Sequence, residues 1–174
     1  MPVSTMFLRQ SLDFLLNAYL PRIEHCVAEL KEEDLWWRPN EASNSIGNLV
    51  LHLSGNLRQW IVSGVGGKPD TRARQTEFDA REGKPGSELL KGLRSVVEEA
   101  AEVLAEIDPR LLSEKRTIQQ KDVSVFYAVY HAVEHFSMHT GQIIQMTKER
   151  TGKDLKFYGF EKGVPVERWR ANRD

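Results

Sequence analysis

Two histidines four residues apart, His135 and His139, are the side chains in this sequence with the clearest capacity for chemistry. Four residues of α-helix turn about 400° and rise about 6 Å, so both imidazoles project from one helix face and can hold one metal ion. A third histidine, His52, lies far upstream in another amphipathic segment. The residue types and the spacing indicate a metal-site protein.

The same stretch contains a second pairing that is incompatible with the first. His131 and His135 flank Glu134 in the H-x-x-E-H pattern of inverted zinc peptidases, in which two histidines bind zinc and the glutamate activates water. Such a site needs another protein ligand, typically a glutamate well downstream. The chain after His139 offers only three: Glu149, Glu161 and Glu167. The short remainder argues against the peptidase interpretation.

Polar residues also line up around His52. Asn48 and Asn56 lie one turn before and one turn after it, and Gln142 lies one turn beyond His139 on the later segment. A helix built to bury Leu and Val aligns such residues where its face lines a wet cavity or a functional site. A solvent-exposed polar stripe on each helix explains the pattern equally well. Asn48, Asn56 and Gln142 are therefore candidates for orienting ligands or substrate.

Apolar residues recur at three-and-four spacing over four segments, which predicts four amphipathic helices. They cover residues 4–30, with a kink near Pro21, then 46–63, 87–107 and 122–150, the last with Asp122 as its N-cap. The sequence thus predicts an all-α protein of one domain, residues 1–174, folded as a four-helix bundle. The interior of such a bundle is a common place for metal ligands drawn from facing helices.

The connecting segments are expected to lack regular structure. Residues 64–86 are rich in Gly, Pro and charge, which predicts a long surface loop whose charged run, 72–81, is solvated. A strand-like stretch at 116–119 has no visible pairing partner and is expected to be loop. The C-terminal tail, 153–174, is expected to pack against the bundle through its aromatic residues, which are Phe157, Tyr158, Phe160 and Trp169.

Composition narrows the classes of partner and compartment. The 24 Lys and Arg nearly balance the 25 Asp and Glu, so no electrostatic footprint for nucleic acid or an anionic membrane is visible. Cys26 is the single cysteine, which rules out an internal disulfide and fits a reducing compartment. The sequence lacks a cationic start followed by an apolar stretch, and it lacks the roughly 18 uninterrupted apolar residues of a membrane helix. These features predict a cytoplasmic protein that binds neither membrane nor nucleic acid.

Three blocks resemble the signature blocks of the DinB/YfiT-like superfamily of helical-bundle proteins. They are Trp37-Arg38-Pro39, the block Ser45-Ile46-Gly47-Asn48-Leu49 followed by His52, and the block from His135 to His139-Thr140-Gly141-Gln142. The resemblance spans most of the chain. It implies a divalent metal ion, usually nickel or zinc, held by His52, His135 and His139 in a bundle that is often a homodimer. Thr140 stands where the family commonly carries arginine.

The resemblance also implies an activity on a small-molecule substrate. Members are described as metal-dependent hydrolases, and a subset as S-transferases that attach low-molecular-weight thiols to electrophiles. Three neutral imidazoles would leave the ion an open position at which a thiol becomes a thiolate or the pKa of water falls to about 7. We therefore expect thiol transfer, with hydrolysis by metal-bound water as the alternative. A helical dimer whose metal only ties two helices together, or a metal-free histidine cluster, is a non-catalytic alternative.

Overall fold

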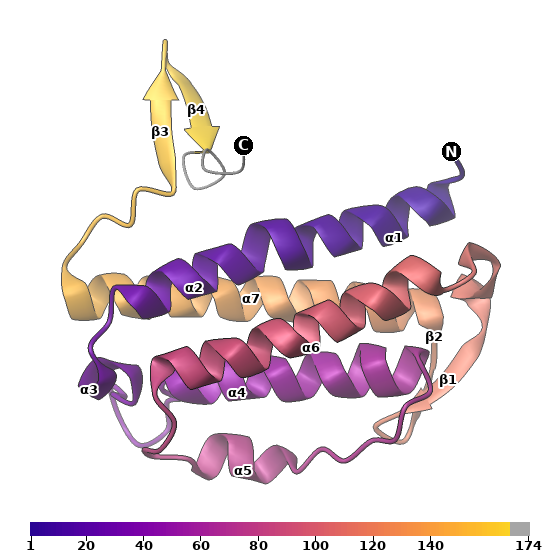
Figure 1. Ribbon diagram of the computed structural model, residues 1–174, viewed down its shortest axis with the longest axis horizontal. Coiled ribbons are helices and arrows are strands. Elements are labelled where there is room, and N and C mark those ends of the chain that lie inside the picture. Colours follow the sequence, from indigo (N-terminus) through magenta and orange to yellow (C-terminus); the bar gives the residue numbers. More distant parts are fainter. Residues whose placement is uncertain (168–174) are drawn as a thin grey trace.

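Most of the protein is helical. The computed structural model describes residues 1–167, in which four long helical stretches run side by side (Figure 1). The first consists of α1 (Val3–Asp13), η1 (Phe14–Tyr19) and α2 (Leu20–Ala28) without a break. Its middle part, η1, is π-helical and directly precedes Pro21, whose ring crowds the carbonyl four residues back. The disturbance predicted near Pro21 thus takes the form of a widened turn. A short helix, α3 (Glu32–Leu35), follows.

The second helical stretch is capped by side chains that the sequence places at its start. It consists of α4 (Ile46–Leu57) and the π-helical η2 (Arg58–Val65). Ser45 Oγ accepts a hydrogen bond from the Asn48 backbone N–H, and Asn48 Oδ1 accepts one from the Ser45 backbone N–H. This capping box satisfies two amide groups that the first turn would otherwise leave without partners. It fixes where α4 begins and therefore the direction in which His52 points.

The remaining long helices are α6 (Gly86–Glu106) and α7 (Val125–Thr151). The predicted N-cap of the last helix, Asp122, is wrong by two residues. Ser124 caps α7 by accepting a hydrogen bond from the Tyr127 backbone N–H, because Asp122 is part of a strand and pairs with Thr117. The helix ends at Gly152, whose φ of 67° is the left-handed conformation that glycine adopts without a steric penalty.

Two antiparallel hairpins correct the prediction of a purely all-α fold. After a 3₁₀ turn, η3 (Pro109–Ser113), the strands β1 (Lys115–Ile118) and β2 (Lys121–Ser124) pair with each other. The stretch at 116–119 therefore finds its partner in the next few residues. The tail forms a second hairpin, β3 (Tyr158–Glu161) and β4 (Val164–Glu167), which projects away from the helices in Figure 1. Leu155 and Phe157 are buried as expected of the tail, whereas the hairpin is largely exposed; Trp169 lies outside the described residues.

The predicted loop at 64–86 is also more structured than expected. It contains α5 (Arg74–Asp79), which lies along α4 at the side of the molecule (Figure 1). The core itself lies between the long helices, where α4 packs against both α6 and α7. Its largest fully buried side chains include Leu53, Leu93 and Phe136. None of the helices at 1–167 is long and apolar enough to cross a membrane.

Candidate metal centre

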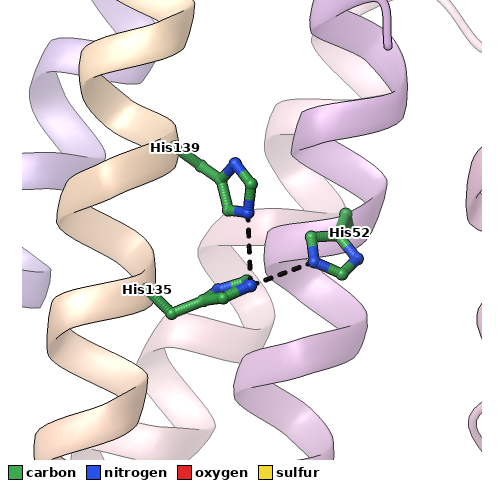
Figure 2. Close-up of side chains that lie close together, drawn as sticks. All are labelled: His52, His135 and His139. Atoms are coloured by element: carbon green, nitrogen blue, oxygen red, sulfur yellow. Dashed lines mark hydrogen bonds between the residues drawn. The ribbon is translucent and has the colours of Figure 1, made fainter. Parts of the chain in front are cut away.

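Three imidazole rings from two helices meet between α4 and α7. Figure 2 shows His52 on one helix facing His135 and His139, which lie one turn apart on the other. One ligand nitrogen from each ring lies within 4.8 Å of the other two. Because His52 and His135 are 83 residues apart in sequence, their contact exists only in the folded protein. The structure thus brings together the three residues that the sequence resemblance singles out.

The separations of the nitrogen atoms match those around a single ion. The Nε2 atom of His135 lies 3.0 Å from Nε2 of His52 and 3.2 Å from Nε2 of His139. Two nitrogen ligands at about 2.1 Å from one ion, subtending an angle between about 90° and 109°, lie about 3.0 to 3.4 Å apart. Two of the three nitrogen separations thus match those around one ion, and all three ligand nitrogens lie within 4.8 Å of one another.

On the side away from these nitrogens, two of the rings face oxygen acceptors of neighbouring side chains. These acceptors favour metal binding through Nε2. His139 Nδ1 lies 2.6 Å from Gln142 Oε1, and His52 Nδ1 lies 2.9 Å from Glu77 Oε2. Each acceptor favours the tautomer with its proton on Nδ1, which leaves the Nε2 lone pair free for an ion. The Nδ1 atom of His135 is buried without a hydrogen-bond partner. Two of the three rings are thus oriented by a neighbour, and the third is held by packing alone.

Burial disfavours a positive charge on the two histidines of α7. It lowers the pKa of His135 to about 3, and positive charge on His139 and His52 would lower that pKa further. Burial also lowers the pKa of His139, against the hydrogen bond that His139 donates to Gln142, which raises it. At neutral pH neither of these two rings therefore carries a second proton. A divalent cation fits these residues, because it can accept the nitrogen lone pairs of three unprotonated imidazoles that face one another.

The charged run at 72–81, predicted to be solvated, instead supplies buried groups at the histidines. The side chains of Arg72 and Glu77 are only 3% and 9% exposed. Arg72 donates to both carboxylate oxygens of Glu77, with Nε 2.7 Å from Oε1 and Nη2 2.8 Å from Oε2. Burial raises the pKa of the Glu77 carboxyl, but hydrogen bonds from Arg72 and His52 outweigh it and hold that pKa below its usual value. Glu77 is therefore an ionised acceptor at neutral pH.

The three polar residues predicted to orient ligands or substrate take different positions. Gln142 contacts His139 directly, as described above. Asn48 does not touch a histidine; its side-chain amide donates to the backbone carbonyls of Glu77 and Ala80 and so holds α5 against α4. Asn56 is buried one turn after His52. Because Asn48, His52 and Asn56 are all buried, the alternative of a solvent-exposed polar stripe is wrong for α4.

The remaining histidine of the H-x-x-E-H pattern, His131, has its ring centroid 5.5 Å from that of His135 but is not part of the group of converging ligand atoms among the described residues. The His131 ring packs on the Trp60 ring with 4.1 Å between centroids, and it also stacks on Tyr127. Glu134 is exposed on the outer face of α7. The pairing of His131 with His135 thus gains no support from the geometry.

A cavity of about 610 Å³ is lined by Gln142, the side chain that contacts His139, although none of the three histidines is itself among the lining residues. It opens between α7 and the segment that leads into α4, and its walls include Leu49, Met138 and Gln142. Glu149 is the single ionisable side chain among the lining residues of the described chain, and no basic side chain lines the cavity there. Such a mixture of apolar surface and few polar groups is typical of a small-molecule site.

Comparisons with known proteins agree with this fold. A family model described as "Protein of unknown function (DUF1572)" matches residues 3–164. Among solved structures, the chain is similar to the crystal structure of a DinB-like protein from Bacillus cereus ATCC 10987. The TM-score is 0.65 and the sequence identity 17%, over 85% of this chain and 93% of the other. No curated protein matches significantly. At this level of identity the likeness concerns the fold.

Proposed function

Because this chain belongs to the DUF1572 family, whose fold is DinB-like, we propose that it is a metal-dependent enzyme with His52, His135 and His139 as ligands. The proposed reaction is transfer of a low-molecular-weight thiol to a small electrophile. The observation that carries the proposal is the convergence of one nitrogen from each of three histidines within 4.8 Å, with His135 Nε2 at 3.0 and 3.2 Å from the other two. Nickel and zinc both suit three imidazoles.

Each part of the chain has a defined task in this proposal. A divalent ion held by His52, His135 and His139 would act as a Lewis acid and would favour the thiolate form of a thiol at neutral pH. The three histidines are fewer ligands than a closed structural site requires, which would leave room for a substrate. Gln142 orients the His139 ring, and Asn48 keeps α5 docked over His52. The buried apolar residues around the rings exclude water that would compete with the thiol.

The neighbouring cavity is the proposed place for the electrophile. Gln142 lines the cavity and also contacts His139, so a molecule bound there lies next to the ligand set. The carboxylate of Glu149 in its wall, without a basic partner among the lining residues, favours an uncharged or cationic electrophile over an anionic one. Met138 and Leu49 provide apolar contact for its carbon skeleton.

The decisive experiment combines metal analysis with a turnover assay. Purified protein is loaded with nickel or zinc, and the metal-to-protein ratio is measured for the wild type and His135→Ala. Turnover is then followed with bacillithiol, mycothiol or glutathione and an uncharged model electrophile. We expect one metal ion per chain, lost in the variant, and turnover that needs both metal and thiol. Metal binding without thiol-dependent turnover would refute thiol transfer.

The alternatives give different results in the same assay. Hydrolysis by metal-bound water predicts turnover of an ester or amide that needs the metal and proceeds without thiol. A non-catalytic tie between α4 and α7 predicts bound metal and no turnover of either kind. A metal-free histidine cluster predicts no stoichiometric metal at all.

We also propose that the protein is a homodimer. The outer face of α7 exposes Phe126, Tyr130 and Met138, of which Tyr130 is 55% exposed, and Phe7 of α1 stacks on Phe126. An apolar face of this kind is typical of a protein contact surface. Light scattering would give twice the chain mass of 20.0 kDa for the wild type, and Tyr130→Glu is expected to be monomeric. A monomeric wild type would refute the dimer.

A further inference from the structure

We propose that Glu77 is a positioning residue that selects the metal-binding tautomer of His52, and that Gly55 provides the space in which it does so. The inference rests on the proposed metal site and adds a group to it that comes from α5, outside the two ligand-bearing helices. It assigns a role to a segment that contributes no metal ligand.

Two neighbours make opposite demands on the same nitrogen of His52. Glu77 Oε2 lies 2.9 Å from Nδ1, and Arg72 Nη2 lies 3.1 Å from it. A carboxylate can only accept a hydrogen bond, so Glu77 requires a proton on Nδ1. A guanidinium can only donate, so Arg72 alone would require a bare Nδ1 and hence a proton on Nε2. A proton on Nε2 blocks the atom that faces His135, and the metal-binding form therefore depends on Glu77.

The position of the carboxylate is fixed from several sides. Arg72 holds both of its oxygens, and Gln59 Oε1 in turn accepts a hydrogen bond from Arg72 Nη1 at 2.9 Å. The side chain of Asn48 holds the backbone carbonyl of Glu77 at 2.9 Å. With so many contacts, Glu77 is oriented towards His52 before any ion binds. Mutating such outer partners of metal-binding histidines typically lowers metal affinity by about 10- to 100-fold.

The close approach of α5 to α4 requires a residue without a side chain at position 55. Gly55 lies three residues after His52 on α4, and a Cβ atom added to it would lie 2.0 Å from Glu77 Oε1 and 3.0 Å from Arg72 Nε. Alanine at this position must therefore displace the carboxylate and its arginine. Glycine is otherwise less favourable than alanine inside a helix. Its presence at position 55 is explained by the space that the ion pair of Arg72 and Glu77 occupies.

The first test measures the affinity for Zn²⁺ by competition with a chromophoric chelator. We expect Glu77→Ala and Gly55→Ala each to lower the affinity about 10- to 100-fold. Glu77→Gln keeps an acceptor oxygen and is expected to lie closer to the wild type. Gly92→Ala is the matched control, because it changes a helical glycine of α6 that has nothing within 4 Å of the added Cβ. Its affinity should equal that of the wild type.

The second test reads the tautomer directly in the metal-free protein, from the ¹⁵N chemical shifts of His52. We expect the proton on Nδ1 in the wild type and in Glu77→Gln, and on Nε2 in Glu77→Ala, where Arg72 remains as the single partner. A merely structural role for Glu77 would leave the tautomer unchanged. His139 serves as the internal control, because its Nδ1 contacts Gln142.

The outcomes separate the two proposals. If the wild type binds Zn²⁺ through the three histidines but Glu77→Ala and Gly55→Ala bind equally well, the role of Glu77 is refuted and the metal site stands. If the His52 tautomer does not change in Glu77→Ala, the role of Glu77 is likewise refuted. If the wild type binds no Zn²⁺ while the tautomer does change, the metal site is refuted and the selection of the tautomer by Glu77 stands.

Discussion

Metal binding is expected to raise the melting temperature of the wild type and of His131→Ala, and to raise that of His135→Ala far less. The contrast is informative because both histidines lie on α7 one turn apart, and only His135 has its Nε2 among the converging atoms. His52 and His135 are 83 residues apart in the sequence, so the unfolded chain does not hold the three proposed ligands together. The proposed site therefore exists only in the native state. Ligands that bind only the native state stabilise it by mass action.

The expected size follows from that relation. Free metal at 100 times the dissociation constant adds about 2.7 kcal/mol to the free energy of unfolding. For a chain of this length, about 2 to 4 °C per kcal/mol gives a rise of about 5 to 11 °C. If loss of one ligand weakens binding about 100-fold, the same metal concentration adds only about 0.4 kcal/mol, a rise of about 1 to 2 °C.

The assay is thermal unfolding by circular dichroism with and without Ni²⁺ or Zn²⁺, for the wild type and the two variants. His131→Ala loses its contact with Trp60, which is expected to lower its melting temperature without metal. The rise on adding metal is therefore compared, and not the absolute value. Loss of the rise in His131→Ala with its retention in His135→Ala would refute the ligand set. An unchanged melting temperature in the wild type would refute the metal site.

Three further predictions concern the fold that supports the site. Ile118→Ala removes the buried side chain of β1 that packs beside Gly64. It is expected to lower the free energy of unfolding by about 2 to 4 kcal/mol in urea denaturation, and an unchanged midpoint would contradict the packing. Burial raises the pKa of the Cys26 thiol to about 11, so a thiol reagent at pH 8 should label it only after unfolding, and rapid labelling of the native protein would contradict this. Asp34→Ala removes the hydrogen bonds from Arg150 that tie α3 to α7, and a loss of about 1 to 2 kcal/mol is expected in the same urea experiment, where no change would contradict it.

The helices could be predicted because their burial follows a simple period. Apolar side chains such as Leu53, Leu93 and Phe136 recur at helical spacing and are all fully buried. The hairpin formed by β1 and β2 escaped prediction because Ile118 is its one fully buried residue, and alternation is absent. Its pairing depends on a tight turn in which Gln119 and Gln120 have φ of 52° and 63°, which residue type alone does not indicate.

The three converging histidines could be predicted because their spacing and flanking residues form recognisable blocks, and the predicted resemblance to DinB-like proteins is confirmed by the fold comparison. Arg72 and Glu77 were missed because a run of alternating charges usually faces solvent. Their partners lie 20 and 25 residues away, where sequence periodicity carries no information. Gly55, close to His52 inside a well-capped helix, is the local signal that something approaches the backbone there.

The π-helical turns of η2 directly follow α4, which carries His52, and they set how the residues beyond them are rotated about the helix axis. Ordinary winding of the same eight residues, with none removed, would swing everything beyond them by about 100°. His52 could then keep its direction only if Ile61 and Val62 turned out of the interior. The wider turns thus let one continuous helix direct His52 towards α7 and bury the apolar side chains that follow, so natural variants that lack one residue there should show ordinary winding with the same positions buried.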